Sequence, residues 1–171
     1  MKTLIESLSD TQRDSLQDEF QLLEPTGWVI KIAHEKDWRA ANEAFLTHER
    51  DRGRAEMAHL MAALKAVRPV SPTQAADLVA TALTLFVGPN QPRDAVQKLG
   101  PASVRVRVCD CPTYRRLEAT HWRGVTACGT WHRRHGWYDA LGLYPVDSVI
   151  AESKWGNEAC EAPIEFDQGP R

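Results

Sequence analysis

The stretch THWRGVTACGTWHRRHGW, residues 120–137, combines three histidines, three tryptophans and one cysteine within eighteen positions. Thiols and imidazoles attack electrophilic carbons, transfer protons and bind metal ions, and indole rings commonly line small-molecule pockets. This composition favours one of three roles: reaction with a ligand, metal binding, or the core of a small sheet domain.

A second pair of thiols precedes this stretch, in SVRVRVCDC. The alternation of valine and arginine predicts a half-buried strand, so Cys109 and Cys111 share one face with Arg105 and Arg107. Positive neighbours lower the pKa of a thiol and raise its thiolate fraction. The arginine face therefore suits a nucleophile or a metal ligand.

Nucleophilic catalysis needs a thiol, a base that removes its proton, and donors that stabilise negative charge. The candidate catalytic residues are Cys111, Cys128, Cys160, His121 and His132, with His135 as a further candidate base. The candidate substrate-binding residues are Arg105, Arg107, Arg123, Trp131 and Trp155.

A divalent metal such as zinc is the alternative use of these side chains. His132 and His135 are three residues apart, and Cys128 precedes them by one turn, so the three side chains are candidate ligands of one ion. Arg133 and Arg134 would repel a dication, and an inert polar helix face remains the competing interpretation. The spacing of the four cysteines matches neither a zinc ribbon nor a ferredoxin.

The elements before residue 100 are predicted to be helical. Ser9 is a candidate N-cap with Gln12 at the capping-box position, and a second helix is expected over residues 36–66. The middle of that second helix is densely charged and contains Gly53, which allows a break or a solvent-spanning stretch there. Ser71 and the following proline begin a buried helix that runs to Gly88. PNQPRDAVQKLG then predicts a turn and a short helix that ends at Gly100.

Strand patterns dominate after residue 100. SVRVRVC is expected to be a strand, a short helix is expected from Thr113, and residues 146–154 and 160–166 are expected to form two further strands. Pro163 favours an edge position for the last strand. The fold class is therefore α+β: one domain, 1–171, with a helical half (1–100) followed by a small antiparallel sheet with an inserted helix (101–171).

Charge is unevenly distributed although the net charge is only −2. Residues 105–135 carry a net +5 and residues 136–171 a net −5. Pairing between these neighbouring segments is favoured over nucleic-acid binding, because the basic segment contains no lysine and the whole chain is slightly acidic. No apolar run reaches the roughly 20 residues of a membrane-spanning helix, and charges interrupt the N-terminal stretch where a signal peptide would be apolar. We therefore expect no membrane association and a cytoplasmic protein with reduced thiols.

The segment from Val104 to Phe166 resembles the hydrolases of L-2-amino-thiazoline-4-carboxylic acid. The resemblance rests on Cys111 in VCDCPTY, Cys128 in TACGTWH, and Gly156 with Cys160 in WGNEAC. The closing hairpin and its cysteine are also similar to the small-ligand-binding domains named after vinyl reductases. Relatives commonly continue the last cysteine with Asp and Phe, where this chain has Glu161 and Ala162.

The resemblance implies a cysteine-dependent hydrolase that opens a cyclic, non-peptide C–N bond in a small heterocyclic carboxylic acid. The partner would be that small molecule, with a homo-oligomer or a partner enzyme as further expectations. The alternative is a non-catalytic small-molecule or metal-binding module, or an accessory subunit of a larger enzyme.

Overall fold

Helices form most of this computed structural model, which describes residues 4–21, 26–67, 71–88, 91, 95–100, 103–109, 128–146 and 159–167. The α-helices in these ranges are α1 (Asp10–Gln21), α2 (Thr26–Glu35), α3 (Trp38–Ala63), α4 (Pro72–Ala82) and α6 (Gly129–Leu141). A 3-10 turn, Leu4–Ser7, precedes α1, and a π-helical turn, Leu83–Val87, extends α4 to Gly88.

Capping boxes begin two of these helices, at the N-cap residues that the sequence predicts. At α1, the backbone amide of Gln12 donates to Oγ of Ser9 (3.2 Å) and the Gln12 side chain accepts from the Ser9 amide (2.9 Å). Ser71 and Gln74 form the same reciprocal pair at α4, with Pro72 in the first helical position. These bonds satisfy backbone donors that have no partner within the helix, so the helix starts are fixed locally.

The strands are β1 (Val96–Gly100), β2 (Ser103–Cys109), β3 (Tyr144–Val146) and β4 (Ala159–Asp167), joined antiparallel in the order β1-β2-β4-β3. On β2, the three valines 104, 106 and 108 are buried, whereas Arg105 and Arg107 are exposed, as the alternation predicts. The register places Arg107 opposite Glu161 of β4, so the basic and acidic segments do pair as adjacent strands at this position.

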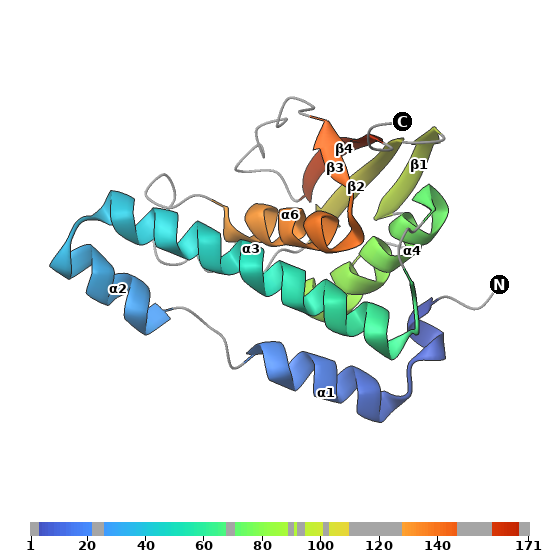
Figure 1. Cartoon of the computed structure of the whole chain (residues 1–171), viewed down its shortest axis with the longest axis horizontal. Helices are drawn as coiled ribbons and strands as arrows, with labels where there is room; N and C mark the ends of the chain where they lie inside the picture. The colour runs from blue at the N-terminus through green and yellow to red at the C-terminus, as the bar shows by residue number, and fades with distance from the viewer. Residues whose placement is uncertain are drawn as a thin grey trace.

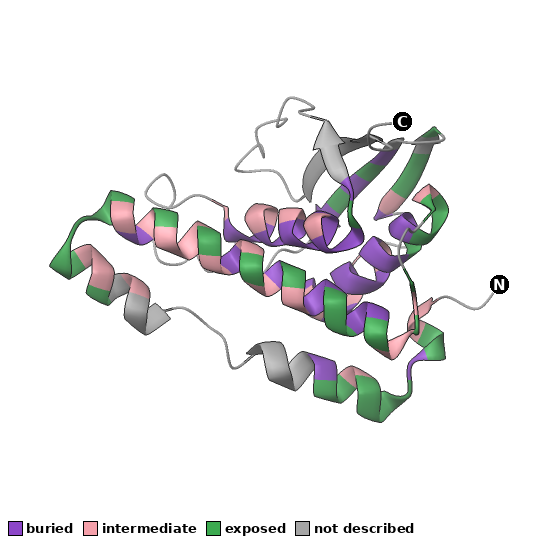
Figure 2. Ribbon diagram, in the orientation of Figure 1, coloured by how far each residue is buried: buried purple, intermediate pink, exposed green. Residues whose placement is uncertain are grey.

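The layers are arranged around α3 (Figure 1). α6 lies between α3 and the sheet, while α1 and α2 follow the opposite side of α3. Figure 2 shows the buried surface concentrated on α4, α6 and the inner side of α3. One apolar cluster joins helices and sheet; its largest fully buried members are Trp137, Tyr138, Met57, Leu60, Leu78, Leu83, Val79, Val104, Val106 and Val108. The predicted α+β class, a helical half followed by a small antiparallel sheet, is confirmed.

Two local predictions are wrong. The short helix expected to end at Gly100 is strand β1, because Val96 to Gly100 pair with β2, and this tertiary pairing outweighs local helix preference. β4, which contains Pro163, is not an edge strand, since it lies between β2 and β3; the described pairing with β3 begins only at Glu165, beyond the proline. For the middle of the expected second helix the sequence allows a break or a solvent-spanning stretch; the structure has no break, because α3 continues through Gly53.

Some predicted elements lie outside the described residues. These are the short helix from Thr113 and residues 147–154 of the expected second strand. The inserted helix that the structure describes is α6, between β2 and β3.

Candidate functional site on α6

Cys128 is the N-cap residue of α6. Its backbone is extended (φ −73°, ψ 100°), and its carbonyl oxygen accepts from the amides of Trp131 (3.1 Å) and His132 (3.4 Å). N-cap side chains usually accept a hydrogen bond from the first turn, but the Cys128 side chain makes no such bond. The half-buried thiol is in no disulfide and stands at the positive end of the helix dipole, which favours the thiolate.

Glycines bring α6 into backbone contact with α3. A Cβ on Gly53 of α3 would lie 2.0 Å from the carbonyl oxygen of Arg133, and a Cβ on Gly136 of α6 would lie 2.0 Å from that of Arg50. A Cβ on Gly129 would lie 2.6 Å from the ring of Phe45. The two helices run side by side in the same direction, and only glycine permits this approach.

A buried carboxylate joins the two helices beside this contact. Glu56 of α3, 0 % exposed, accepts from both Nε (2.7 Å) and Nη2 of Arg133 on α6. The same carboxylate accepts from the indole nitrogen of Trp137 (2.9 Å) and from Nε of Arg52 (3.2 Å). Four donors therefore compensate the loss of water around Glu56, which is the condition for burying a charge.

Glu49 is the second buried acid of α3, and it lies where α6 begins. Its Cγ would be 3.1 Å from a Cβ on Gly129, and its carboxylate is 3.8 Å from Nη1 of Arg52. Burial raises the pKa of Glu49, and the charges of Arg133 and Arg52 partly oppose that rise. Burial lowers the pKa of Arg52, as does the neighbouring Arg133.

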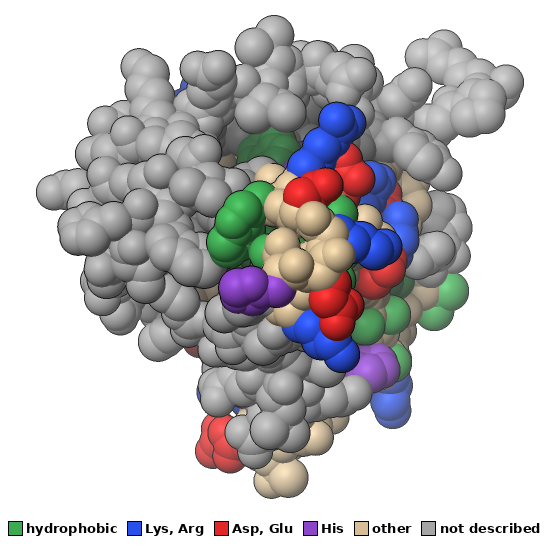
Figure 3. All heavy atoms as spheres, turned by 90° about the vertical axis from the view of Figure 1, so that its left-hand side faces the viewer, with side chains coloured by type: hydrophobic (Ala, Val, Ile, Leu, Met, Phe, Trp, Pro, Cys, Tyr) green, Lys and Arg blue, Asp and Glu red, His purple; other side chains and the backbone are tan. Residues whose placement is uncertain are grey.

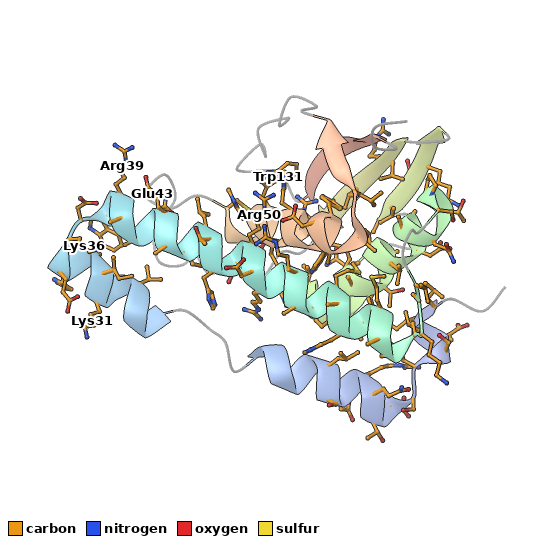
Figure 4. The ribbon with its side chains drawn as sticks, viewed as in Figure 1. Lys31, Lys36, Arg39, Glu43, Arg50 and Trp131 are labelled. Carbon is orange, nitrogen blue, oxygen red and sulfur yellow. The ribbon has the colours of Figure 1, made fainter. Side chains whose placement is uncertain are left out.

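Asp139 closes the α3–α6 contact at its solvent side. Its carboxylate accepts from Nε and Nη2 of Arg50 (2.7 and 2.9 Å) and from Nε of Arg54 (2.9 Å). The hydrogen bond from Arg50 lowers the pKa of Asp139 despite partial burial. Figure 4 shows Arg50 at this contact and Trp131 extending from α6 on the other side.

Four residues of α6, at spacings of three, one and three, share the side of the helix that does not carry the glycine contact with α3. The guanidinium of Arg134 lies over the Trp131 ring, with Cζ 4.7 Å from the centroid. The His135 ring centroid is 5.0 Å from that of Trp131 and 5.9 Å from that of Tyr138. Burial raises the pKa of Tyr138 to about 12, against the lowering effect of Arg134, so its hydroxyl stays protonated. We call Trp131, Arg134, His135 and Tyr138 the outer face of α6.

The two histidines of α6 are held in the neutral form. Burial, followed by the charge of Arg50, lowers the pKa of His132. Burial is also the main cause that lowers the pKa of His135 to about 4; Arg50, His132 and Arg134 add to it, and Asp139 opposes it. The two rings are 6.4 Å apart between centroids. Neutral imidazoles can accept a proton or donate a hydrogen bond at neutral pH.

The structure brings together only part of the predicted site. Cys128, Trp131, His132 and His135 lie within two turns of α6. Arg105 and Arg107 are exposed on β2. Cys160 is opposite Val108 in the β2–β4 register. The remaining predicted residues, Cys111, His121, Arg123 and Trp155, lie outside the described residues.

No three-ligand metal site is found among the described histidines, cysteines and acids. Cys128, His132 and His135 all belong to that described set, so they do not gather into such a site.

The interpretation of the histidines and the intervening arginines as a solvated polar face is wrong for the arginines. Arg133 and Arg134 are buried, because α6 packs against α3 on one side and toward the sheet on the other. Two of the arginines counted in the basic segment therefore do not contribute to a surface patch. On the end of the molecule seen in Figure 3, basic and acidic side chains are interspersed, and Lys31–Glu35 and Arg39–Glu43 form ion pairs on α2 and α3.

Sequence reasoning missed the acidic partners on α3. The signal was available in the spacing: Ala41, Phe45, Glu49, Gly53, Glu56 and Leu60 recur every three or four residues. This is the spacing of a single helix side, and its two acids stand among residues that are otherwise small or apolar. A buried acid at such a position requires a cation from another element, which here is Arg133.

None of the helices in the described part of the chain combines the length and apolar character needed to cross a bilayer. Comparison with known proteins gives no match to a protein-family model, to a curated protein or to a solved structure. The resemblance to the thiazoline-carboxylate hydrolases therefore stays a prediction.

Proposed function

We propose that the protein is a hydrolase that opens a cyclic, non-peptide C–N bond in a small heterocyclic carboxylic acid, with Cys128 as nucleophile and His132 as base. The observation that supports this most directly is a thiol at the N-terminus of α6, not used as a cap, followed one turn later by a half-buried histidine with a lowered pKa. The proposal includes a reducing compartment such as the cytoplasm, since the mechanism needs a reduced thiol.

The reaction would proceed in two steps. His132 removes the proton of the Cys128 thiol, and the sulfur adds to the trigonal carbon of the ring C–N bond. That bond breaks as the ring nitrogen takes the proton from the imidazolium. His132 then removes a proton from water, the hydroxide adds to the same carbon, and the C–S bond breaks with return of the proton to sulfur. One water is consumed, one C–N bond is cleaved, and no electrons are exchanged with an external group.

His135 would have a different role from His132. Its pKa of about 4 makes it a weak base at neutral pH, but its neutral ring can donate a hydrogen bond to a developing negative charge. The second candidate function, binding of a small molecule without catalysis, is supported by the outer face of α6, where a tryptophan, a histidine and a buried arginine are in contact. These residue types serve a binding module as well as an enzyme.

The test is turnover of L-2-amino-thiazoline-4-carboxylate and a panel of other five-membered cyclic amides and amidines that carry a carboxylate. Ring opening is followed by mass spectrometry as the gain of one water. We expect Cys128→Ser to lower kcat/KM by several orders of magnitude, and His132→Gln by about a hundredfold or more. Thr73→Ser, at an exposed position on α4, is the control and should retain turnover.

The outcomes separate the two functions. Full turnover by Cys128→Ser, with loss in Cys111→Ser or Cys160→Ser, would assign the nucleophile to another cysteine. Full turnover by every single cysteine variant would exclude the nucleophilic mechanism. Ligand-dependent thermal stabilisation without ring opening would favour the binding module. Alkylation by iodoacetamide, read by peptide mass spectrometry, should label Cys128 and be slowed by substrate.

A further inference from the structure

Arg134 is a buried cation without a counterion among the described residues. Arg134 is only 3 % exposed. Its Nε and Nη1 have no hydrogen-bond partner in the described part of the chain. The Trp131 ring, 4.7 Å from Cζ, is its described contact. A ring face attracts a cation but accepts none of the in-plane N–H groups of a guanidinium.

Among the described residues, the acids near α6 are already paired with other arginines. Glu56 holds Arg133 through two hydrogen bonds, and Glu49 lies beside Arg52 on α3. These groups are on the α3 side of α6, whereas Arg134 is on the outer face with Trp131. Arginine remains charged under all physiological conditions, so a buried arginine without an anion destabilises the folded protein.

We propose that Arg134 binds the carboxylate of a small-molecule ligand, against the Trp131 ring and beside His135. One buried guanidinium matches the single charge of a carboxylate, and its planar N–H groups fit two coplanar oxygens. The surrounding burial excludes water, which strengthens the pair. The inference rests on the proposed function and identifies the residue that selects an acid over its neutral analogue. Arg105 and Arg107 of β2, the other described candidates for binding the carboxylate, are exposed to water, whereas Arg134 is buried.

The experiment measures binding separately from turnover. The probes are L-2-amino-thiazoline-4-carboxylate and the corresponding carboxamide, titrated calorimetrically into the full chain carrying Cys128→Ser, so that no ring opening occurs. We expect the acid to bind at least about tenfold more tightly than the amide, the effect of one charge-assisted hydrogen bond. Arg134→Met should abolish this preference, and Arg39→Met, at an exposed position on α3, should retain it.

The melting temperature of the ligand-free protein distinguishes an anchor from a structural ion pair. If the counterion of Arg134 is a ligand, Arg134→Met removes an uncompensated charge and leaves the melting temperature of the ligand-free protein unchanged or higher. Addition of the acid then no longer raises the melting temperature of this variant. A large fall in melting temperature would overturn the proposal, because it would indicate a carboxylate of the chain itself on Arg134. Arg134→Lys serves as a second variant that keeps the charge and should retain a weaker preference for the acid.

Failure of this inference is distinct from failure of the proposed function. Ring opening with equal binding of acid and amide would overturn the role of Arg134 and leave the hydrolase intact. Acid-selective binding that depends on Arg134, without ring opening by the protein that retains Cys128, would support the anchor and exclude the hydrolase. Binding of neither probe would overturn the anchor for this class of ligand.

Discussion

The α carbon of Gly53 in α3 lies against the peptide carbonyl of Arg133 in α6, so close that a Cβ would stand 2.0 Å from that oxygen. The contact is nearly reciprocal, since a Cβ on Gly136 of α6 would stand at the same distance from the carbonyl oxygen of Arg50. The pair of glycines lets the helix backbones approach far more closely than side chains normally allow. This approach brings Glu56 within reach of Arg133 and Trp137.

Gly53→Ala should destabilise the protein although alanine is the better helix former. Propensity alone would contribute about 1 kcal/mol of stabilisation, but the new methyl group meets backbone that cannot rotate away. We expect a net loss of about 1–3 kcal/mol or more in urea unfolding. Gly142→Ala is the comparison, because it has open space around it and costs only the strain of a left-handed residue, about 1 kcal/mol. A stabilised Gly53→Ala would disprove the close contact.

Glu56→Gln should cost about 3–5 kcal/mol in unfolding free energy, because Arg133 then remains buried without a counterion. The double variant Glu56→Gln with Arg133→Met should lose clearly less than the sum of the two single changes, since the orphaned charge is removed. Glu43→Gln, which breaks the exposed pair with Arg39, is the control and should change stability by no more than about 0.5 kcal/mol. Strict additivity in the buried pair would contradict this description.

Stability should fall as the pH drops from about 6.5 to about 4, in part because of His135. Its folded pKa of about 4 lies below the ordinary histidine value of 6.5, so the unfolded chain binds this proton more readily. The stabilisation is complete above the unfolded pKa and is lost progressively toward the folded one, by about 3 kcal/mol at most. His135→Phe should flatten this part of a stability-against-pH curve measured by urea unfolding. An unchanged curve would place the His135 pKa near its ordinary value.

Protonation of Asp139 should reduce the stability of the protein at a lower pH than protonation of His135 does. The hydrogen bond from Arg50 lowers the pKa of the Asp139 carboxyl, so its contribution to stability is complete above the ordinary aspartate value of 3.8 and is lost as the pH falls below it. Asp139→Asn should therefore destabilise the protein at pH 7 and show a smaller further loss than the parent protein between about pH 4 and pH 2. Asp51→Asn, which removes the exposed partner of Arg54, is the matched control. Equal acid sensitivity of Asp139→Asn and the parent would exclude this role.

Local sequence determined the elements whose signals are complete within a few residues. The reciprocal bonds of Ser9 with Gln12 and of Ser71 with Gln74 form between neighbours, and the valine–arginine alternation of β2 assigns one side to the core. These features depend on backbone geometry and on the hydrophobic effect, which act the same way in any fold. The helical half, the sheet half and the α+β class followed from them.

Tertiary structure decided what the charged residues do. Glu49 and Glu56 look like part of a solvated stretch in the sequence, and Arg133 and Arg134 like a solvated helix face, yet all four are buried. Burying an ionic side chain costs free energy unless a partner lies within hydrogen-bonding distance. For Glu56 that partner is Arg133, 77 positions away along the chain. Sequence spacing cannot show which distant residues meet, so the pairing of α3 with α6, and the arginine it leaves on the outer face, became visible only in three dimensions.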